Sequence, residues 1–261
     1  MIEAASKQLT TTYTPTESDV GTKSLNLTNT KAMDNFIYNL FTNPITISPV
    51  LPSPYFLVDA SVSSGFVVDG TDNVTSIKDQ VSNTTINASI YAWLYNISLY
   101  SQNSLAYLKS RNNVDAVVDM TLPLPISGDF TFTYIGRYKY NASIKYVVGF
   151  TVGTTTTTII AENNNTYTAG TPTTLSSPKS WVLEQSYMIT IQRVSNTITA
   201  YVDGVLWGVI ANAGSGDLNK ISIGPGFGLR FDTFETAVYN SAISSSSLAL
   251  VRSTKFAKWG I

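Results

Sequence analysis

An Asp-Gly pair at residues 203–204 separates two runs in which apolar residues alternate, Thr197–Val202 and Val205–Ile210. This pattern is the strongest short-range signal for a β-hairpin, because both residues of a type I′ turn need a positive φ. A two-residue turn also fixes the register of the two strands, so each residue is assigned to one face of the pleat. The face expected to lie in the core carries Ile198, Ala200, Val202, Val205, Trp207 and Val209.

The opposite face of this hairpin is mixed in polarity and suits water, a ligand or a neighbouring subunit. It carries Thr197, Thr199, Tyr201, Leu206, Gly208 and Ile210. In the expected register Trp207 lies opposite Ala200, so we predict that Trp207 is buried and is not a platform for a sugar. Tyr201 and Thr199 are the hairpin residues that we expect to contact a carbohydrate, because an aromatic face packs well against the C–H side of a pyranose ring.

From Tyr55 onward the sequence is typical of an all-β protein. Only 13% of the residues are charged and 43% are hydrophobic, and runs of strand character cover residues 130–135, 146–152 and 187–193. Strands at short spacing with no amphipathic helix between them predict a two-sheet antiparallel β-sandwich of jelly-roll type. Serines before a short apolar run at 244–251 predict a closing helix or turn.

The N-terminal part differs from the rest in composition. Four of the ten prolines lie within residues 44–54, where fixed φ angles suit an extended connector. We therefore predict an N-terminal arm with a short helix over residues 1–54, and a β-sandwich over residues 55–261. The helix expected over 31–41 either lies on the β domain or serves docking and oligomerisation; the sequence leaves both open.

Charge and composition exclude several classes of partner. The formal net charge is −1 and no run of Lys or Arg occurs, so we expect no binding to nucleic acid. No apolar run approaches the roughly 20 residues of a membrane span, and the first residues carry no pattern of a secretory signal. The absence of Cys excludes disulfides and thiolate chemistry.

Several segments, taken in order, resemble the concanavalin A-like lectin/glucanase superfamily, and particularly its laminin G-like modules. The matching segments are Leu57–Ser61, Val68–Asp79, Gly128–Tyr134, Ile189–Arg193, Tyr201–Gly204, Ile221–Gly224 and Phe231–Asn240. Ile77 replaces the customary Trp of the family pattern. The resemblance covers roughly residues 55–255 and implies a concanavalin A-like jelly roll, used mostly to bind glycans or proteins and sometimes to hydrolyse glucans.

The sequence offers little for catalysis. It contains no histidine, which excludes a Ser-His-Asp triad, and a glycosidase needs two carboxylates beside the scissile bond. The stretch Arg230–Glu235 resembles the Glu-x-Asp-x-x-Glu motif of the superfamily's glucanases in Asp232 and Glu235, but Arg230 stands where the nucleophile is required. We therefore expect that the chain is not an enzyme, with glycan hydrolysis as the less favoured alternative.

Calcium is the one metal that the sequence makes worth considering. Asp69, Asp72 and Asp79 lie near a glycine-containing turn, and hard cations bind carboxylate and carbonyl oxygens. The alternative, which we favour, is that these residues bond their own backbone, as Asp commonly does in turns. No other cofactor is expected.

Further aromatic residues leave two interpretations open. Phe227 in a glycine-rich loop is either an exposed sugar contact or a plug beneath the loop. The aromatic residues of segment 91–100 are either a sugar-binding face or core; they are Tyr91, Trp93, Tyr95 and Tyr100.

These features together predict a non-enzymatic recognition module that binds carbohydrate on a cell surface or host envelope. The layout suggests display on a larger assembly such as a virion, as a capsid decoration, head fibre or tail-associated protein, and hence an extracellular or virion-surface location. Residues 1–54 would contact other structural proteins, and a homo-oligomer is expected. The alternative is a structural subunit whose only ligand is protein, with Tyr201, Leu206 and Ile210 in an interface.

Overall fold

The computed structural model describes most of the chain from Val50 onward. The described residues are 50–86, 93–96, 98–110, 118–139, 144–153, 155–162, 165–168, 175–176, 182–210, 216–223 and 231–261. The helix and arm predicted within residues 1–49, Tyr91, Phe227 and Arg230 lie outside these ranges. Residues Val50–Ile261 form one compact unit.

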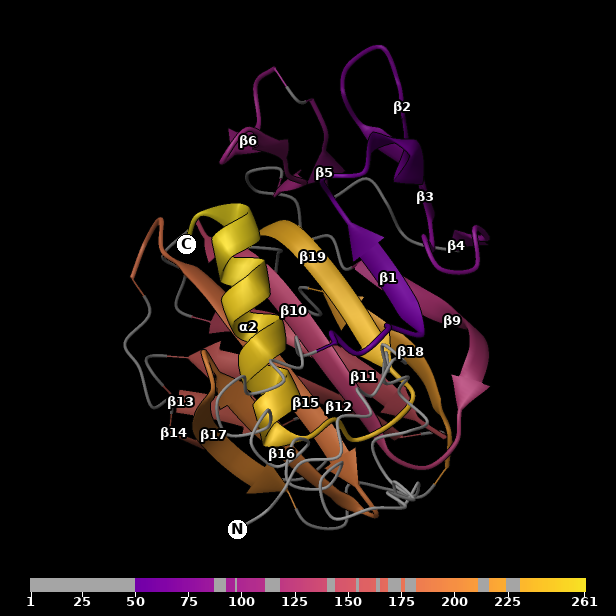
Figure 1. Cartoon of the computed structure of the whole chain (residues 1–261), viewed down its shortest axis with the longest axis vertical. Helices are drawn as coiled ribbons and strands as arrows, with labels where there is room; N and C mark the ends of the chain where they lie inside the picture. Colours follow the sequence, from indigo (N-terminus) through magenta and orange to yellow (C-terminus); the bar gives the residue numbers. More distant parts are fainter. Residues whose placement is uncertain are drawn as a thin grey trace, which may run out of the picture. The chain divides into compact units, whose positions relative to one another are not determined.

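Two six-stranded antiparallel sheets are stacked as a sandwich (Figure 1). The first sheet consists, in spatial order, of β1 (Phe56–Asp59), β19 (Phe231–Tyr239), β10 (Phe130–Tyr138), β15 (Ser186–Val194), β16 (Thr197–Val202) and β17 (Val205–Ile210). The second consists of β14 (Leu175–Ser176), β13 (Asn165–Thr168), β12 (Thr155–Glu162), β11 (Ile144–Val152), β18 (Leu218–Ile223) and β9 (Val118–Ile126). The predicted all-β, two-sheet antiparallel sandwich is confirmed.

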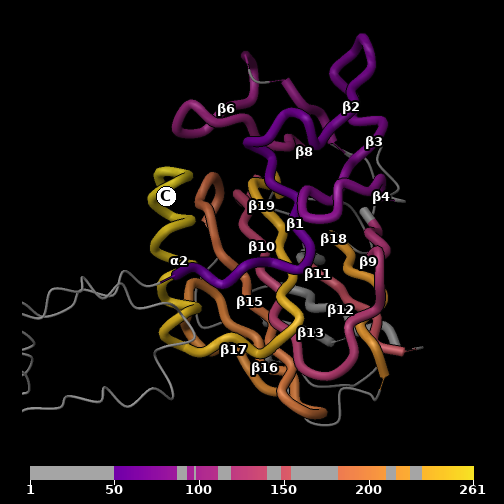
Figure 2. Tube along the Cα trace, turned by 45° about the vertical axis from the view of Figure 1, so that its right-hand side comes forward, coloured from indigo at the N-terminus to yellow at the C-terminus, as the bar shows by residue number. Residues whose placement is uncertain are grey.

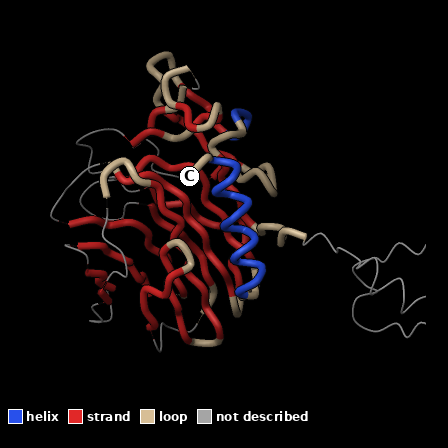
Figure 3. The backbone as a smooth tube through the Cα atoms, turned by 60° about the vertical axis from the view of Figure 1, so that its left-hand side comes forward, coloured by secondary structure: helices blue, strands red, loops and turns tan. Residues whose placement is uncertain are grey.

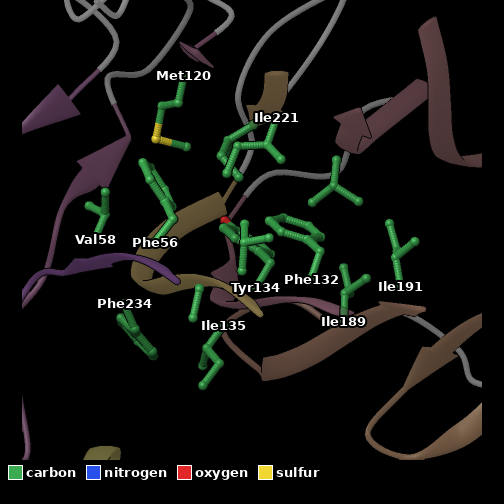
Figure 4. Packing of buried hydrophobic residues seen from close by; sticks show 14 of the residues in the cluster. Phe56, Val58, Met120, Phe132, Tyr134, Ile135, Ile189, Ile191, Ile221 and Phe234 are labelled. Carbon is green, nitrogen blue, oxygen red and sulfur yellow. The ribbon is translucent and has the colours of Figure 1, made fainter. Parts of the chain in front are cut away.

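The core lies between the two sheets and follows the alternation of their strands. Phe132 and Tyr134 of β10 and Ile189 of β15 are buried there, and Met120 and Ile221 face them from the second sheet (Figure 4). Since successive side chains of a strand point to opposite faces, the residues that alternate with them, such as Thr133 and Thr190, face away from this core.

Three small sheets and a 3₁₀ turn gather at one end of the sandwich (Figure 2). Their elements are η2 (Ser63–Gly65), β2 (Phe66–Val68), β3 (Val74–Lys78), β4 (Thr85–Ile86), β5 (Trp93–Leu94), β6 (Ser101–Gln102), β7 (Leu105–Ala106) and β8 (Lys109–Ser110). Trp93 is fully buried and Tyr95 nearly so, whereas Tyr100 is half-buried. Core packing is therefore the outcome for Trp93 and Tyr95.

The β16–β17 hairpin has the predicted turn, with φ of 48° at Asp203 and 78° at Gly204. Val202 pairs with Val205 and Tyr201 with Leu206, as expected, but the register shifts between Ala200 and Tyr201. The expected pairing beyond that point was wrong: Ala200 faces Gly208, and Ile198 faces Ile210.

A β-bulge explains both the success and the error in this hairpin, because it inserts one extra residue into one strand and reverses the alternation beyond it. Trp207 is buried, as predicted, at 5% exposure. Val209, however, moves to the outer face and is 47% exposed, and Val205 beside the turn is also exposed.

The C-terminal segment forms the helix α2 (Ser245–Trp259), which confirms the predicted closing helix and extends it to Trp259. Ser244 is the N-cap, and its hydroxyl accepts a hydrogen bond from the Ser247 amide; Gly260 ends the helix with φ of 65°. The helix lies along the outer face of the first sheet (Figure 3). Among the described residues, no helix is long and apolar enough to cross a membrane.

Aromatic stacking and ion pairs fix α2 on the sheet. The rings of Trp259 and Phe234 stack at 4.9 Å. The buried carboxylate of Glu235 lies 2.6 Å from the Lys255 ammonium, and Lys258 pairs with Asp59. The helix thus turns the outer face of β10 and β19 into a second buried layer, and β19 is buried along its whole length.

Candidate functional site

A cavity of about 190 Å³ lies between α2 and the outer face of the first sheet. It is lined by Met188, Thr190, Gln192, Tyr201, Gly204, Ser245, Leu248, Ala249 and Arg252. Strand alternation puts the lining residues of β15 on this face, opposite the core residues Tyr187, Ile189 and Ile191. We call this space the α2 cavity.

The walls of the α2 cavity combine apolar surface with hydroxyl groups. Met188, Leu248 and the half-buried ring of Tyr201 give apolar surface. Within the described part of the chain, the hydroxyls of Thr190, Tyr201 and Ser245 have no hydrogen-bond partner. A ligand ring with a C–H face and several hydroxyls would find apolar surface for that face and hydrogen-bonding groups for its hydroxyls in this cavity. The volume is below the roughly 300 Å³ of pockets for drug-sized ligands, so it suits one sugar residue.

Arg252 lines the α2 cavity and is held in place by the hairpin turn. Its Nη1 donates to the backbone carbonyl of Asp203. A Cβ atom added at Gly204 would clash with Nη1, so the guanidinium occupies the space that a side chain would take. Glycine at this position is therefore needed both by the turn, with its positive φ, and by the seat of Arg252.

A second, more polar depression continues from Arg252 along the C-terminal half of α2. This α2 cleft has a volume of about 690 Å³ and is lined by Gln102, Arg137, Glu184, Gln185, Ser186, Asp203, Arg252, Phe256, Gly260 and Ile261. Phe256 provides an aromatic surface, and most other lining groups are planar and polar. The α2 cavity and the α2 cleft share Arg252 and together follow one side of the helix.

Ion pairs organise the floor of the α2 cleft. The Arg137 guanidinium lies 3.0 Å from the fully buried Asp232 carboxylate and 4.7 Å from the ring centre of Tyr107. Burial raises the pKa of the Asp232 carboxyl, although Arg137 and the Ser110 amide both stabilise its charged form. Nearby, Lys139 binds both carboxylate oxygens of Glu184 at 2.6 Å.

The residues predicted from the sequence to contact a sugar differ in their positions relative to the α2 cavity. Tyr201 lines the α2 cavity. Thr199 is on the same strand face and half-buried, but it is not among the lining residues. Phe227 lies outside the described residues.

The three candidate calcium ligands are not brought together. Asp69 accepts hydrogen bonds from the amides and side chains of Thr71 and Asn73, and these bonds, the Asn73 side chain first, hold its pKa well below the usual range. Asp72 accepts a bond from the Asn96 side chain. Asp79 lies beyond β3 and is saturated by donors from other residues.

The Asp79 carboxylate shows the alternative role foreseen for these residues. It is fully buried and accepts hydrogen bonds from the Leu57, Val81 and Ser82 amides and from the Ser82 hydroxyl. Asp79 therefore joins β1 to the turn after β3. In the part of the chain that is described, no three acidic groups are gathered as a metal would require.

The carboxylates considered for glycan hydrolysis lie under or beside α2. Asp232 pairs with Arg137, and Glu235, 2% exposed, pairs with Lys255 and Lys258. A register shift after Ile135 occurs between these two acidic residues on β19, so the spacing seen in the sequence does not correspond to simple alternation along the strand.

Most residues of the α2 cavity were missed by reasoning from the sequence. A signal existed for β15: assigning Tyr187, Ile189 and Ile191 to the core implies that Met188, Thr190 and Gln192 face outward. No such signal existed for Leu248 and Arg252, because nothing in the sequence states where a C-terminal helix packs.

No protein-family model matches the sequence, and no curated protein does so either. Solved structures with a similar fold include the sialidase of Trypanosoma rangeli in complex with the inhibitor DANA, at 15% identity and a TM-score of 0.56. The match covers 85% of this chain and 38% of the sialidase chain. The same sialidase in a further structure gives 14% identity, 86% and 38% coverage and a TM-score of 0.53.

The binding domain of Paraclostridial Mosquitocidal Protein 1 is also similar, with 13% identity, a TM-score of 0.51, and coverage of 74% of this chain and 52% of that chain. The chain thus spans little more than a third of the sialidase chains and about half of the toxin domain structure. At these identities the similarity establishes the fold, an antiparallel β-sandwich, and no more.

The prediction that the chain is not an enzyme was wrong. The similar structures include sialidases, so this fold occurs within enzyme chains. The prediction rested on the absence of a histidine-based triad and of one glucanase motif. The absence of a motif excludes one arrangement of catalytic groups, whereas one fold can carry many different arrangements.

Proposed function

We propose that this β-sandwich recognises carbohydrate and that the α2 cavity holds one sugar residue of the glycan. The observation that carries the proposal is the position of Tyr201, whose ring lines the α2 cavity together with the hydroxyls of Thr190 and Ser245. Apolar surface for the C–H face of a sugar and hydroxyls for its rim are the two requirements of such a site. The fold shared with a toxin binding domain supports a recognition role.

Substitution of Tyr201 by Ala tests this proposal. Removal of the ring takes away apolar contact area, so glycan affinity is expected to fall roughly tenfold to a hundredfold. The ligand is first identified on a glycan array with the intact chain, and the affinities are then measured by isothermal titration calorimetry.

Thr199→Ala is the matched control, because Thr199 lies on the same face of β16 two residues away and outside the cavity lining. Its affinity should equal that of the unaltered protein. Equal losses in both variants, or no saturable binding of any glycan by the folded protein, would contradict the proposed site.

The biological setting remains part of the proposal. Display of the sandwich on a virion or another large assembly, an extracellular location, contact with other structural proteins through residues 1–54 and homo-oligomer formation follow from the layout of the sequence alone. Removal of residues 1–54 should leave a folded sandwich that no longer assembles, as measured by size-exclusion chromatography. Loss of folding would show that the segment belongs to the sandwich.

The sialidase neighbours favour hydrolysis of a glycan as a second candidate function. The buried Asp232 carboxylate pairs with Arg137, which lines the α2 cleft. Release of a fluorogenic aglycone from a sialic acid conjugate, with loss of that release in Asp232→Asn, would support this candidate. Turnover that persists in Asp232→Asn would remove Asp232 from it.

A further inference from the structure

Arg252 differs from the other cations along α2 in what it binds. Arg137 and Lys139 each face a carboxylate, at 3.0 Å for Asp232 and 2.6 Å for Glu184. Within the described residues Arg252 forms no ion pair, and its one hydrogen bond goes from Nη1 to a backbone carbonyl. A guanidinium has five N–H donors, so Arg252 keeps donors that no group of the described residues uses.

The acidic residues that line the α2 cleft with Arg252 already have other partners. The Asp203 carboxylate accepts a hydrogen bond of 2.8 Å from the Met188 amide, and the Glu184 carboxylate binds Lys139. The charge of Arg252 is therefore the one cationic charge of the α2 cavity and the α2 cleft that is left without a carboxylate partner among the described residues.

The position of Arg252 gives this charge a role in ligand choice. It lines both the α2 cavity and the α2 cleft, so a chain of sugars extending from one into the other passes beside the guanidinium. Arginine binds carboxylates through parallel N–H···O bonds, which are stronger than bonds between neutral groups. A neutral ring fits the apolar cavity, and an acidic group fits its junction with the cleft.

We propose that the site selects an acidic glycan, in which a sugar carboxylate binds Arg252 while an adjoining ring occupies the α2 cavity. This inference rests on the proposed carbohydrate-binding function and adds the class of ligand. The acidic sugar of the glycan is either a nonulosonic acid, such as sialic acid, or a uronic acid, since both present a carboxylate on a sugar ring.

Calorimetric titration of the full chain with sialyllactose and with a hyaluronan tetrasaccharide tests the two sources of the carboxylate. Each ligand is compared with its methyl ester, which removes the charge and keeps the sugar framework. At least one acid is expected to bind roughly tenfold or more tightly than its ester, the gain of a charge-assisted hydrogen bond. Arg252→Gln should abolish this difference, so that the acid and its ester bind the variant with equal affinity.

The outcomes separate this inference from the function on which it rests. Saturable binding of acid and ester with equal affinity, unchanged in Arg252→Gln, would overturn the acidic preference and leave carbohydrate recognition intact. Failure of the protein to bind any glycan would overturn both. If Arg252→Gln does not fold, salt dependence decides: the affinity for the acid must fall with ionic strength while that for the ester stays constant.

Discussion

At the scale of single residues, Arg193 shows how a buried cation joins the two sheets. Its Nε donates to the Gly128 carbonyl at 2.7 Å and its Nη1 to the Gly216 carbonyl at 2.8 Å, while the guanidinium lies 5.0 Å from the ring centre of Phe130. Gly128 connects β9 to β10, and Gly216 precedes β18. Burial lowers the pKa of Arg193. The sequence placed Arg193 within a strand but gave no sign of these partners.

Replacement of Arg193 by Met should lower the free energy of unfolding by about 2 kcal/mol, because two carbonyl groups lose charge-assisted hydrogen bonds. Lys220→Met is the control: the Lys220–Asp119 pair is 3.0 Å long but both side chains are partly exposed, so its loss should cost less than about 1 kcal/mol. Urea unfolding monitored by circular dichroism measures both. Similar losses in the two variants would refute the role given to Arg193.

At the scale of elements, the hairpin and the helix show what local sequence can predict. The Asp203-Gly204 turn follows from the residues themselves, and the two pairs next to it have the expected register. The bulge beyond Ala200 depends on how β17 packs against its neighbours. Alternation alone therefore placed Val209 in the core, whereas its side chain is exposed. Likewise the serines before residue 248 predicted where α2 begins, but its place over β15 and β16 is tertiary packing.

The N-cap of α2 gives a prediction that belongs to this scale. Ser244→Ala removes the oxygen that accepts from the Ser247 amide at 3.2 Å, so the free energy of unfolding should fall by about 1 kcal/mol. Ser253→Ala, in the body of the same helix, should be neutral or slightly stabilising, because alanine has the higher helix propensity. Chemical denaturation of the two variants distinguishes them; a loss confined to Ser253→Ala would contradict the cap assignment.

At the scale of the whole molecule, the fold was predictable because composition, alternation and turn residues all agree on two antiparallel sheets. Of the candidate site only Tyr201 was predicted, because its outward position follows from alternation near the turn. The other walls come from β15 and α2, which are distant in sequence from one another and meet only when the helix docks. This is why a site at the edge of a packed helix escaped reasoning from local motifs.

The buried tyrosines make the stability of the whole domain depend on alkaline pH. Burial, together with Glu235, raises the pKa of Tyr239 to about 12, and burial raises the pKa of further tyrosines, which are Tyr95, Tyr107, Tyr134 and Tyr187. In the unfolded chain tyrosine ionises near pH 10. The stabilisation is therefore complete below pH 10 and is lost as the pH rises toward about 12, because the unfolded state releases protons first.

Tyrosinate absorbance and circular dichroism followed together through this pH range measure the effect. Ionisation of the buried tyrosines should coincide with unfolding, and Tyr239→Phe should make the decline in stability less steep. Full tyrosine ionisation near pH 10 in a chain that still has native circular dichroism would show that these side chains are accessible to solvent.

The proposed glycan site lies between α2 and the outer face of the first sheet. The most direct measurement is an NMR titration of the isotopically labelled chain with the glycan found on the array. Amide signals of residues lining the α2 cavity, such as Thr190, Tyr201 and Ala249, should shift with a common saturating dependence on ligand concentration. Saturable shifts confined to the loop around Asp69, or to the opposite sheet, would contradict the proposed site.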